Sequence, residues 1–195
     1  MAISWTELVG SLTGLLCVYL VARASIWNWP VGIANTLLYL VVFLRAKLYG
    51  DALLQVVFTA LGVYGWWSWS HADGRRAELP VRRATQAELA IAAGVSLAGT
   101  ASAALALAHG TDSPVPVWDA SVLVLSLVAT WGQAKKWLES WWLWILVDVI
   151  SVPLYVARHL YPTALLYALF LGLCALGLRE WARLLREQPA LEVAE

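Results

Sequence analysis

The sequence predicts an all-α integral membrane protein with seven transmembrane helices, arranged as a 3+1+3 parallel repeat of three-helix bundles. Of its 195 residues, 61% are hydrophobic and 13% are charged, whereas a soluble domain usually carries about 25% charged residues. Apolar stretches of roughly 18 to 22 residues recur along the whole chain, and each is long enough to span the ~30 Å of bilayer hydrocarbon. A secretory signal peptide would give a single short apolar run instead.

Seven helices follow from apolar runs that are separated by charged residues or by Pro and Gly. The predicted spans are 5–22, 29–44, 50–70, 87–108, 116–134, 139–157 and 161–180. A polar loop lies at 70–86, and the polar sequence after Arg179 predicts frayed helix followed by disorder. Trp66, Trp67 and Trp69, at the end of the third span, are interpreted as interfacial anchors.

The first three helices resemble the last three when the chain is aligned with itself at two neighbouring offsets that differ by a single position. The matches are Trp5 with Trp118, Trp29 with Trp142, Leu48-Tyr49 with Leu160-Tyr161, 52–54 with 164–166, Gly65 with Gly177 and Trp69 with Trp181. Two three-helix units separated by one span keep the same orientation. The sequence therefore predicts a first bundle at 1–70, a cytoplasmic loop and linker helix at 71–110, a second bundle at 111–182 and a polar cytoplasmic tail at 183–195.

Basic residues are distributed unequally between the two sides of the predicted bundle. One side receives ten of them: Arg23, Arg75, Arg76, Arg82, Arg83, Lys135, Lys136, Arg179, Arg183 and Arg186. The other side receives three: Arg45, Lys47 and Arg158. Because cytoplasmic loops carry the excess of Lys and Arg, this count predicts a cytoplasmic C-terminus. With an odd number of helices, the N-terminus is then expected outside.

Polar residues inside the spans mark the candidate binding site, because an unpaired polar group in hydrocarbon costs several kcal/mol. On the second, third and sixth helices, polar and aromatic residues recur at spacings of three and four, which place each set on one helix face; the seventh helix adds one tyrosine. The candidate binding residues are Asn35, Tyr39, Gln55, Trp141, Trp144, Asp148 and Tyr167.

Asp148 is the sharpest of these signals. It lies nine residues past Glu139, so about 13 Å into the membrane at ~1.5 Å per residue. An ionised carboxylate at that depth costs at least ~2.5 kcal/mol. Two interpretations remain open: Asp148 is neutral or hydrogen-bonded to Asn35 and ties two helices together, or it attracts a cationic solute between walls of tryptophan. Trp rings offer stacking and cation–π attraction to such a solute.

Several other functions find no support in the sequence. The net charge is zero, which gives no reason to expect a nucleic-acid partner. HExxH, GxSxG, CxxC and Walker motifs are absent from the sequence, so neither an enzyme, nor a metal site, nor a cofactor, nor coupling to ATP is predicted. Cys17 and Cys174 lie inside predicted spans and are interpreted as small packing residues.

Long segments of the chain resemble the PnuC family of vitamin transporters. The first runs from Trp27 to Trp69 and reads WNWPVGIANTLLYLVVFLRAKLYGDALLQVVFTALGVYGWWSW. The second runs from Trp118 to Trp144 and contains WDA, LSLVAT and KKWLESWWLW, followed by Asp148. With the opening SWTELVGSLTGLLCVYL, the resemblance covers residues 4–181.

The resemblance implies a fold similar to the sugar-transporting SWEET proteins, a homotrimer and a location in the bacterial inner membrane. It also implies uptake of nicotinamide riboside by facilitated diffusion, with trapping by a cytoplasmic kinase. The family's helix-6 motif, Trp-x-x-Trp-x-x-x-Asn, is carried here by Trp141, Trp144 and Asp148, and Gln55 and Tyr167 match positions typical of its binding site.

Asp148 stands where many members of the family have Asn, which leaves the identity of the vitamin open. A carboxylate favours a cationic heteroaromatic solute, either nicotinamide riboside or, as the alternative, thiamine; neutral riboflavin fits it less well. Asp148 also raises the question of proton coupling. A membrane scaffold that moves no solute is the alternative from a different class of protein.

Overall fold

The computed structural model is all-helical and describes residues 5–45, 47, 49–71, 79–111 and 114–192. Its helices are α1 (Trp5–Ala22), α2 (Asn28–Arg45), α3 (Tyr49–Ser70), α4 (Gln86–Gly110), α5 (Pro116–Ala134), α6 (Ser140–Ala157) and α7 (Tyr161–Glu192). The prediction of an all-α fold with seven helices is confirmed. Arg75 and Arg76, which belong to the predicted basic side, lie outside the described residues, as does the end of the chain from 193.

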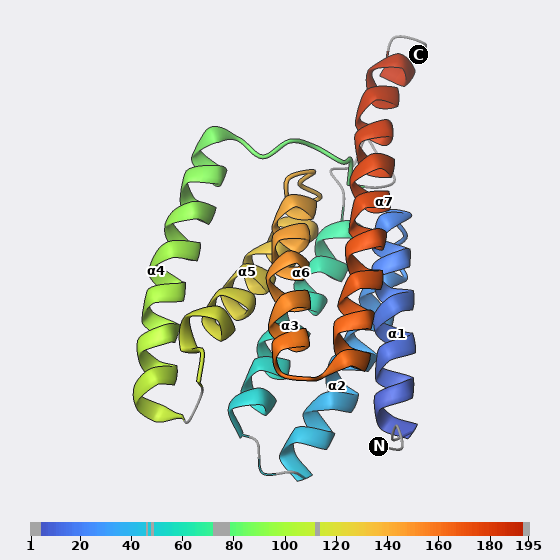
Figure 1. Cartoon of the computed structure of the whole chain (residues 1–195). Helices are drawn as coiled ribbons and strands as arrows, with labels where there is room; N and C mark the ends of the chain where they lie inside the picture. The colour runs from blue at the N-terminus through green and yellow to red at the C-terminus, as the bar shows by residue number, and fades with distance from the viewer. Residues whose placement is uncertain (1–4, 46, 48, 72–78, 112–113, 193–195) are drawn as a thin grey trace.

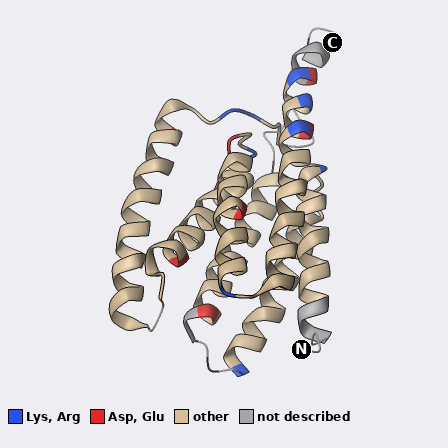
Figure 2. Ribbon diagram, viewed as in Figure 1, with Lys and Arg blue, Asp and Glu red and all other residues tan. Residues whose placement is uncertain are grey.

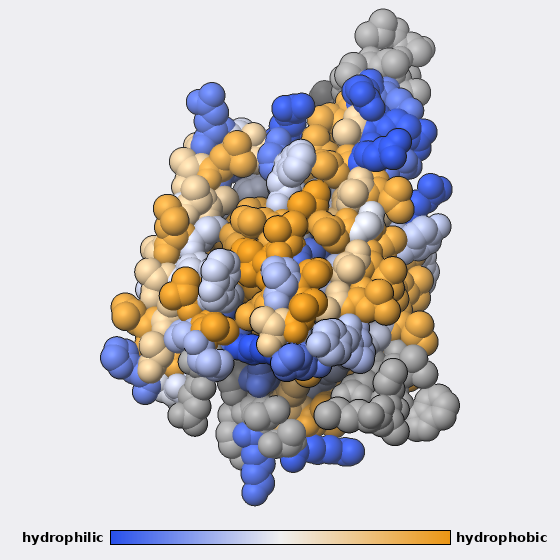
Figure 3. Space-filling view, viewed as in Figure 1, coloured by the Kyte–Doolittle hydropathy of each residue, from blue (hydrophilic) through white to orange (hydrophobic). Residues whose placement is uncertain are grey.

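Among the described residues, four helices are individually long and apolar enough to cross a bilayer. They are α4, α5, α6 and the part of α7 from Tyr161 to Glu187. Figure 3 shows a hydrophobic middle on the visible face of the molecule, with hydrophilic residues gathered toward the two ends. The exposed middle thus presents apolar side chains to its surroundings, as expected of a protein whose solvent there is lipid.

The predicted helix boundaries hold within a few residues except at the C-terminal end. The last span is expected to end at 180, but α7 continues to Glu192. Arg183 pairs with Glu180 at 2.7 Å and with Glu187 at 3.3 Å, at spacings of three and four residues. Such pairs support a solvated helix, so the polar segment that hydropathy assigns to frayed helix and a tail extends α7 beyond the bundle (Figure 1).

The helix contacts have the symmetry of two related halves. Within the described residues, α1 contacts α2 and α2 contacts α3, just as α5 contacts α6 and α6 contacts α7. The halves meet through two pairs, α1 with α7 and α3 with α5. Exchanging α1–α3 with α5–α7 leaves this set of contacts unchanged, so a pseudo-twofold axis relates the halves.

One constant offset relates the described parts of the two halves. It is set by α2 (Asn28–Arg45) and α6 (Ser140–Ala157), which are both 18 residues long and are aligned here from their first residues. We call the shift from Asn28 to Ser140 the repeat offset. The non-glycine residues with positive φ are related by the same offset: Ala24 corresponds to Lys136, and Lys47 corresponds to His159. The matches of Trp29 with Trp142 and of Trp5 with Trp118 are therefore wrong by one position, and the structural counterpart of Trp29 is Trp141.

The linker helix α4 packs against α5 and stands apart from the remaining helices (Figure 1). Its start is fixed by a capping box, in which the Thr85 side chain accepts from the Glu88 amide and the Glu88 carboxylate accepts from the Thr85 amide. Arg82 also donates two hydrogen bonds to Glu88, at 2.8 and 2.9 Å. These bonds raise the pKa of the Arg82 guanidinium above its ordinary value.

The charged residues gather toward the two ends of the bundle (Figure 2). We call the end that carries the α1–α2, α3–α4 and α5–α6 connections and the extension of α7 the basic end. The opposite end carries Arg158, which pairs with Asp119 at 3.2 Å. The interpretation of Trp69 as an interfacial anchor is wrong, because its side chain is 3% exposed at the basic end, whereas Trp66 and Trp67 are exposed.

Candidate functional site

A cavity of about 250 Å³ lies between the two halves of the repeat. Every helix except α4 contributes to its wall. The polar side chains that line it are Asn28, Asn35, Thr36, Thr130, Gln133, Asp148 and Tyr167, with the thiols Cys17 and Cys174. None of the described lining residues is basic. A solute in this space would therefore meet one carboxylate, several neutral polar groups and aromatic rings.

The face of α6 predicted from sequence forms one wall of the cavity. Trp141, Trp144 and Asp148 all line it, and Trp141 and Asp148 are 0% and 2% exposed. The indole N–H groups of Trp141 and Trp144 are buried without a hydrogen-bond partner in the structure, as is that of Trp29 on α2. Buried donors in proteins are almost always paired, so these three indole N–H groups are exceptions, and all three belong to residues that line the cavity.

Asp148 keeps most of its acceptor capacity free for a solute. Its hydrogen-bond partner is the Cys174 thiol, with Sγ 3.4 Å from Oδ2, and a thiol is a weak donor. The bond between Asn35 and Asp148 that one of the two interpretations includes is not formed: the Asn35 amide donates to Thr13 Oγ1 at 2.6 Å and to the Gly10 carbonyl at 3.1 Å. Asn35 thus ties α2 to α1, while the Asp148 carboxylate faces the cavity with room for a positive partner.

The other candidate residues are divided between the cavity and its surroundings. Tyr167 lines the cavity, with its ring centroid 5.0 Å from that of Tyr155. Tyr39 and Gln55 are not among the lining residues of the described structure. Tyr39 stacks on Phe43 at 5.8 Å, and the cavity wall on α3 is formed by Phe58 and Gly62, which lie beyond Gln55 along that helix.

Two glycines make room for the paired tryptophans of the repeat. A Cβ atom added at Gly65 would overlap the ring of Trp29, and one added at Gly177 would overlap the ring of Trp141. Each indole therefore lies directly on the backbone of the neighbouring helix. Both rings line the cavity. The absence of a side chain at the two glycines therefore determines how close each ring lies to the neighbouring helix, and so the width of the cavity.

Sequence reasoning misses several lining residues. Trp29 is missed because the sequence comparison pairs it with Trp142 rather than with Trp141. Cys17 and Cys174 are assigned to packing, and Thr36, the counterpart of Asp148 at the repeat offset, is not singled out. The constant repeat offset is the signal that identifies Trp29 and Thr36, because it pairs them with Trp141 and Asp148.

The fold and the cavity together define a class of protein. Two three-helix halves surround a cavity at their interface, which is how many transporters hold a solute between repeats. The described residues contain no cluster of three or more His, Cys, Asp or Glu side chains that would hold a metal ion. A cavity between two repeated halves of a multi-pass membrane protein is typical of a membrane transporter.

The particular family follows from comparison with known proteins. Residues 4–183 match the nicotinamide mononucleotide transporter family, and the chain belongs to it. The nicotinamide riboside transporter PnuC of Escherichia coli is 29% identical over 95% of this chain and 88% of its own length. The riboflavin/roseoflavin transporter RibM of Streptomyces davaonensis is 34% identical over 92% of this chain and 85% of its own.

A solved structure supports the same assignment of the fold. The crystal structure of the vitamin B3 transporter PnuC matches with a TM-score of 0.75 and 26% identity, over 94% of this chain and 83% of that one. The expectation of a PnuC-like fold is therefore confirmed.

Proposed function

We propose that this protein is a passive uniporter for nicotinamide riboside, which a cytoplasmic kinase then traps by phosphorylation. The observation that carries the proposal is the placement of Trp141, Trp144 and Asp148 along one wall of a cavity that has no basic lining residue in the described structure. The indoles stack on the pyridinium ring, and the carboxylate neutralises its charge. The unpaired indole N–H groups donate to the ribose oxygens.

Riboflavin is the competing substrate that a specific observation favours. The relative with 34% identity transports riboflavin and roseoflavin, whereas the nicotinamide riboside transporter of E. coli is 29% identical. Identities this similar do not separate the two vitamins. The carboxylate supports the cationic vitamin, because burying an ionised Asp148 beside an uncharged flavin leaves its charge without a counter-ion. Thiamine carries a positive ring as well and is the remaining alternative among cations.

The orientation and the assembly belong to the same proposal. The ten-to-three distribution of Lys and Arg in the sequence supports an N-terminus outside and the basic end in the cytoplasm. A homotrimer in the inner membrane remains a prediction from the family resemblance. Neither affects which solute the cavity of a single chain accepts.

Calorimetric titration of the purified protein with the three vitamins tests the substrate. We expect saturable binding of nicotinamide riboside at least tenfold tighter than that of riboflavin, because only the cation pairs with Asp148. Calorimetry is preferable to fluorescence, since the chain has 13 tryptophans and the flavin itself absorbs light. Heat from thiamine but none from nicotinamide riboside would favour the thiamine alternative, and riboflavin binding most tightly would overturn the argument from charge.

A further inference from the structure

Two tryptophans at the basic end form matching hydrogen bonds between the halves of the repeat. Trp69 Nε1 on α3 donates to the Gln133 carbonyl on α5 at 3.1 Å. Trp181 Nε1 on α7 donates to the Val21 carbonyl on α1 at 3.0 Å. The repeat offset relates the two donors and also the two acceptors, so one bond is the repeat image of the other. They occur at α3–α5 and α1–α7, the two contacts through which the described halves meet.

The same two rings connect the basic end to the cavity. Trp69 and Trp181 contact each other, with ring centroids 6.1 Å apart. Trp69 packs edge-on against Trp29 at 5.4 Å, and Trp181 packs edge-on against Trp141 at 5.5 Å. The four rings thus form a continuous row that crosses the pseudo-twofold axis. Its two outer members, Trp29 and Trp141, are cavity walls.

This row lies at the basic end of the cavity, where its outer members Trp29 and Trp141 form part of the wall. All four rings are at most 5% exposed, and they belong to a buried cluster that also includes Val21 and the small or aliphatic side chains around it. At the other end of the cavity, Asn35, Tyr167 and Phe170 are only partly buried.

We propose that Trp69 and Trp181 form a paired latch that holds the basic end shut and positions Trp29 and Trp141 in the cavity wall. Opening this end requires α3 to part from α5 and α7 to part from α1, and each separation breaks one of the two N–H···O bonds. Since Trp29 and Trp141 pack on the latch rings, a solute that shifts these walls also shifts the latch. The role of the latch in transport rests on the proposed function. Whether the latch closes the basic end can be measured without any vitamin.

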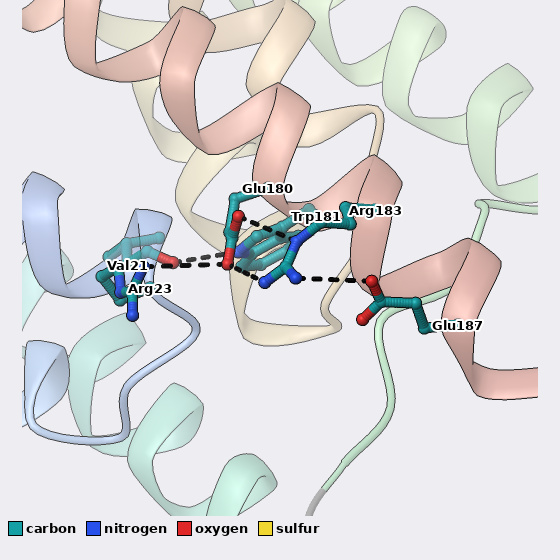
Figure 4. Close-up of polar contacts among 6 residues, drawn as sticks. All are labelled: Val21, Arg23, Glu180, Trp181, Arg183 and Glu187. Carbon is teal, nitrogen blue, oxygen red and sulfur yellow. Dashed lines mark hydrogen bonds and ion pairs between the residues drawn. The ribbon is translucent and has the colours of Figure 1, made fainter. Parts of the chain in front are cut away.

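An ion pair reinforces one side of the latch on its solvent side. Arg23, after α1, lies 3.9 Å from Glu180 on α7, beside the Trp181–Val21 bond (Figure 4). The repeat equivalents of this pair are Lys135 and Ser68, and Lys135 lies instead over the ring of Tyr64 at 5.3 Å. The α1–α7 side is therefore joined by an ion pair, whereas the α3–α5 side is joined by cation–π contacts of Lys135 with Tyr64 and of Lys136, 4.3 Å away, with Trp69.

The native cysteines provide a test of the latch. The chain has two cysteines, Cys17 and Cys174, and both line the cavity. A membrane-impermeant maleimide added to sealed vesicles of either sidedness reports from which end these thiols are reached. We expect little labelling from the basic end in the unmodified protein. Trp69→Phe and Trp181→Phe keep a ring but remove the N–H donor, and each should raise labelling from that end at least fivefold.

Trp67→Phe is the matched control, because Trp67 lies on the same helix as Trp69 but is 57% exposed, and it should leave labelling unchanged. If folded Trp69→Phe and Trp181→Phe proteins label like the unmodified one, the latch is refuted. Should these variants fail to fold, Glu180→Gln weakens the outer ion pair at a partly exposed site. It should raise labelling about twofold, and no rise would equally refute the latch.

The outcome is separable from that of the proposed function. Increased labelling in a protein that binds none of the vitamins supports the latch and contradicts the substrate assignment. Unchanged labelling in variants of a protein that binds nicotinamide riboside refutes the latch and supports the substrate assignment.

Discussion

Replacing Asp148 with asparagine is expected to weaken the binding of nicotinamide riboside by at least tenfold while leaving the fold intact. Asparagine has nearly the same shape as aspartate, so the cavity should persist. The loss comes from the charge: a hydrogen bond or contact to a charged group contributes about 1.5–3 kcal/mol, and ~1.4 kcal/mol is a tenfold change in affinity. Calorimetry on the variant measures this directly.

Asp51→Asn is the control for this change. Asp51 is an exposed carboxylate near the start of α3, away from the cavity, so its loss should leave the affinity unaltered. The Asp148→Asn protein should also discriminate less between nicotinamide riboside and riboflavin. An unchanged affinity for the cation would mean that the carboxylate does not contact the solute.

Replacing Gly177 with alanine is expected to have the second large effect. The added methyl group would overlap the Trp141 ring, which must then move into the cavity or away from Trp181. Overpacking of this kind costs about 1–3 kcal/mol. We expect a lower melting temperature and at least tenfold weaker vitamin binding, measured by thermal unfolding and by calorimetry on the same preparation.

Gly172→Ala is the matched control on the same helix, because an added Cβ there meets no atom within 4 Å. It should bind the vitamin as the unmodified protein does. Gly65→Ala, which affects Trp29 through the same geometry, should resemble Gly177→Ala if both halves of the repeat form the site. If Gly177→Ala binds normally, Trp141 is not a wall of the binding site.

The helices are predictable because hydropathy reports directly on which segments can lie in lipid. The extension of α7 is not, because Arg183 and Glu187 are polar and the hydropathy signal ends before them. Their pairing along one helix face stabilises the helix outside the apolar region. The spacing of three and four residues between these charges, rather than hydropathy, indicates that the helix continues.

The register of the repeat escapes sequence comparison for a different reason. Trp141 and Trp142 are adjacent, so the sequence alone does not decide which of them corresponds to Trp29. Packing decides it: Trp29 lies on Gly65 and Trp141 lies on Gly177, whereas Trp142 is 60% exposed. The left-handed backbone conformation of Ala24 and Lys136 is also not predictable from the sequence, because glycine is the usual signal for that conformation.

The cavity is only partly predictable. The stripe of Trp141, Trp144 and Asp148 on α6 can be predicted from the sequence, because a carboxylate within an apolar span is energetically costly and usually marks a functional site. The contribution of α1, through Gly14 and Cys17, carries no such signal. Small and apolar residues are compatible with both a cavity wall and a packed interface, and the helix arrangement alone distinguishes them.

Counterflow of labelled nicotinamide riboside in proteoliposomes tests the central claim, that this cavity passes a cationic vitamin without an energy source. Vesicles that contain only the purified protein and are preloaded with unlabelled vitamin should transiently accumulate the label, with saturation. This accumulation should be unaffected by an imposed pH gradient and strongly reduced by Asp148→Asn. The absence of saturable counterflow, or counterflow that requires the pH gradient, would contradict the account.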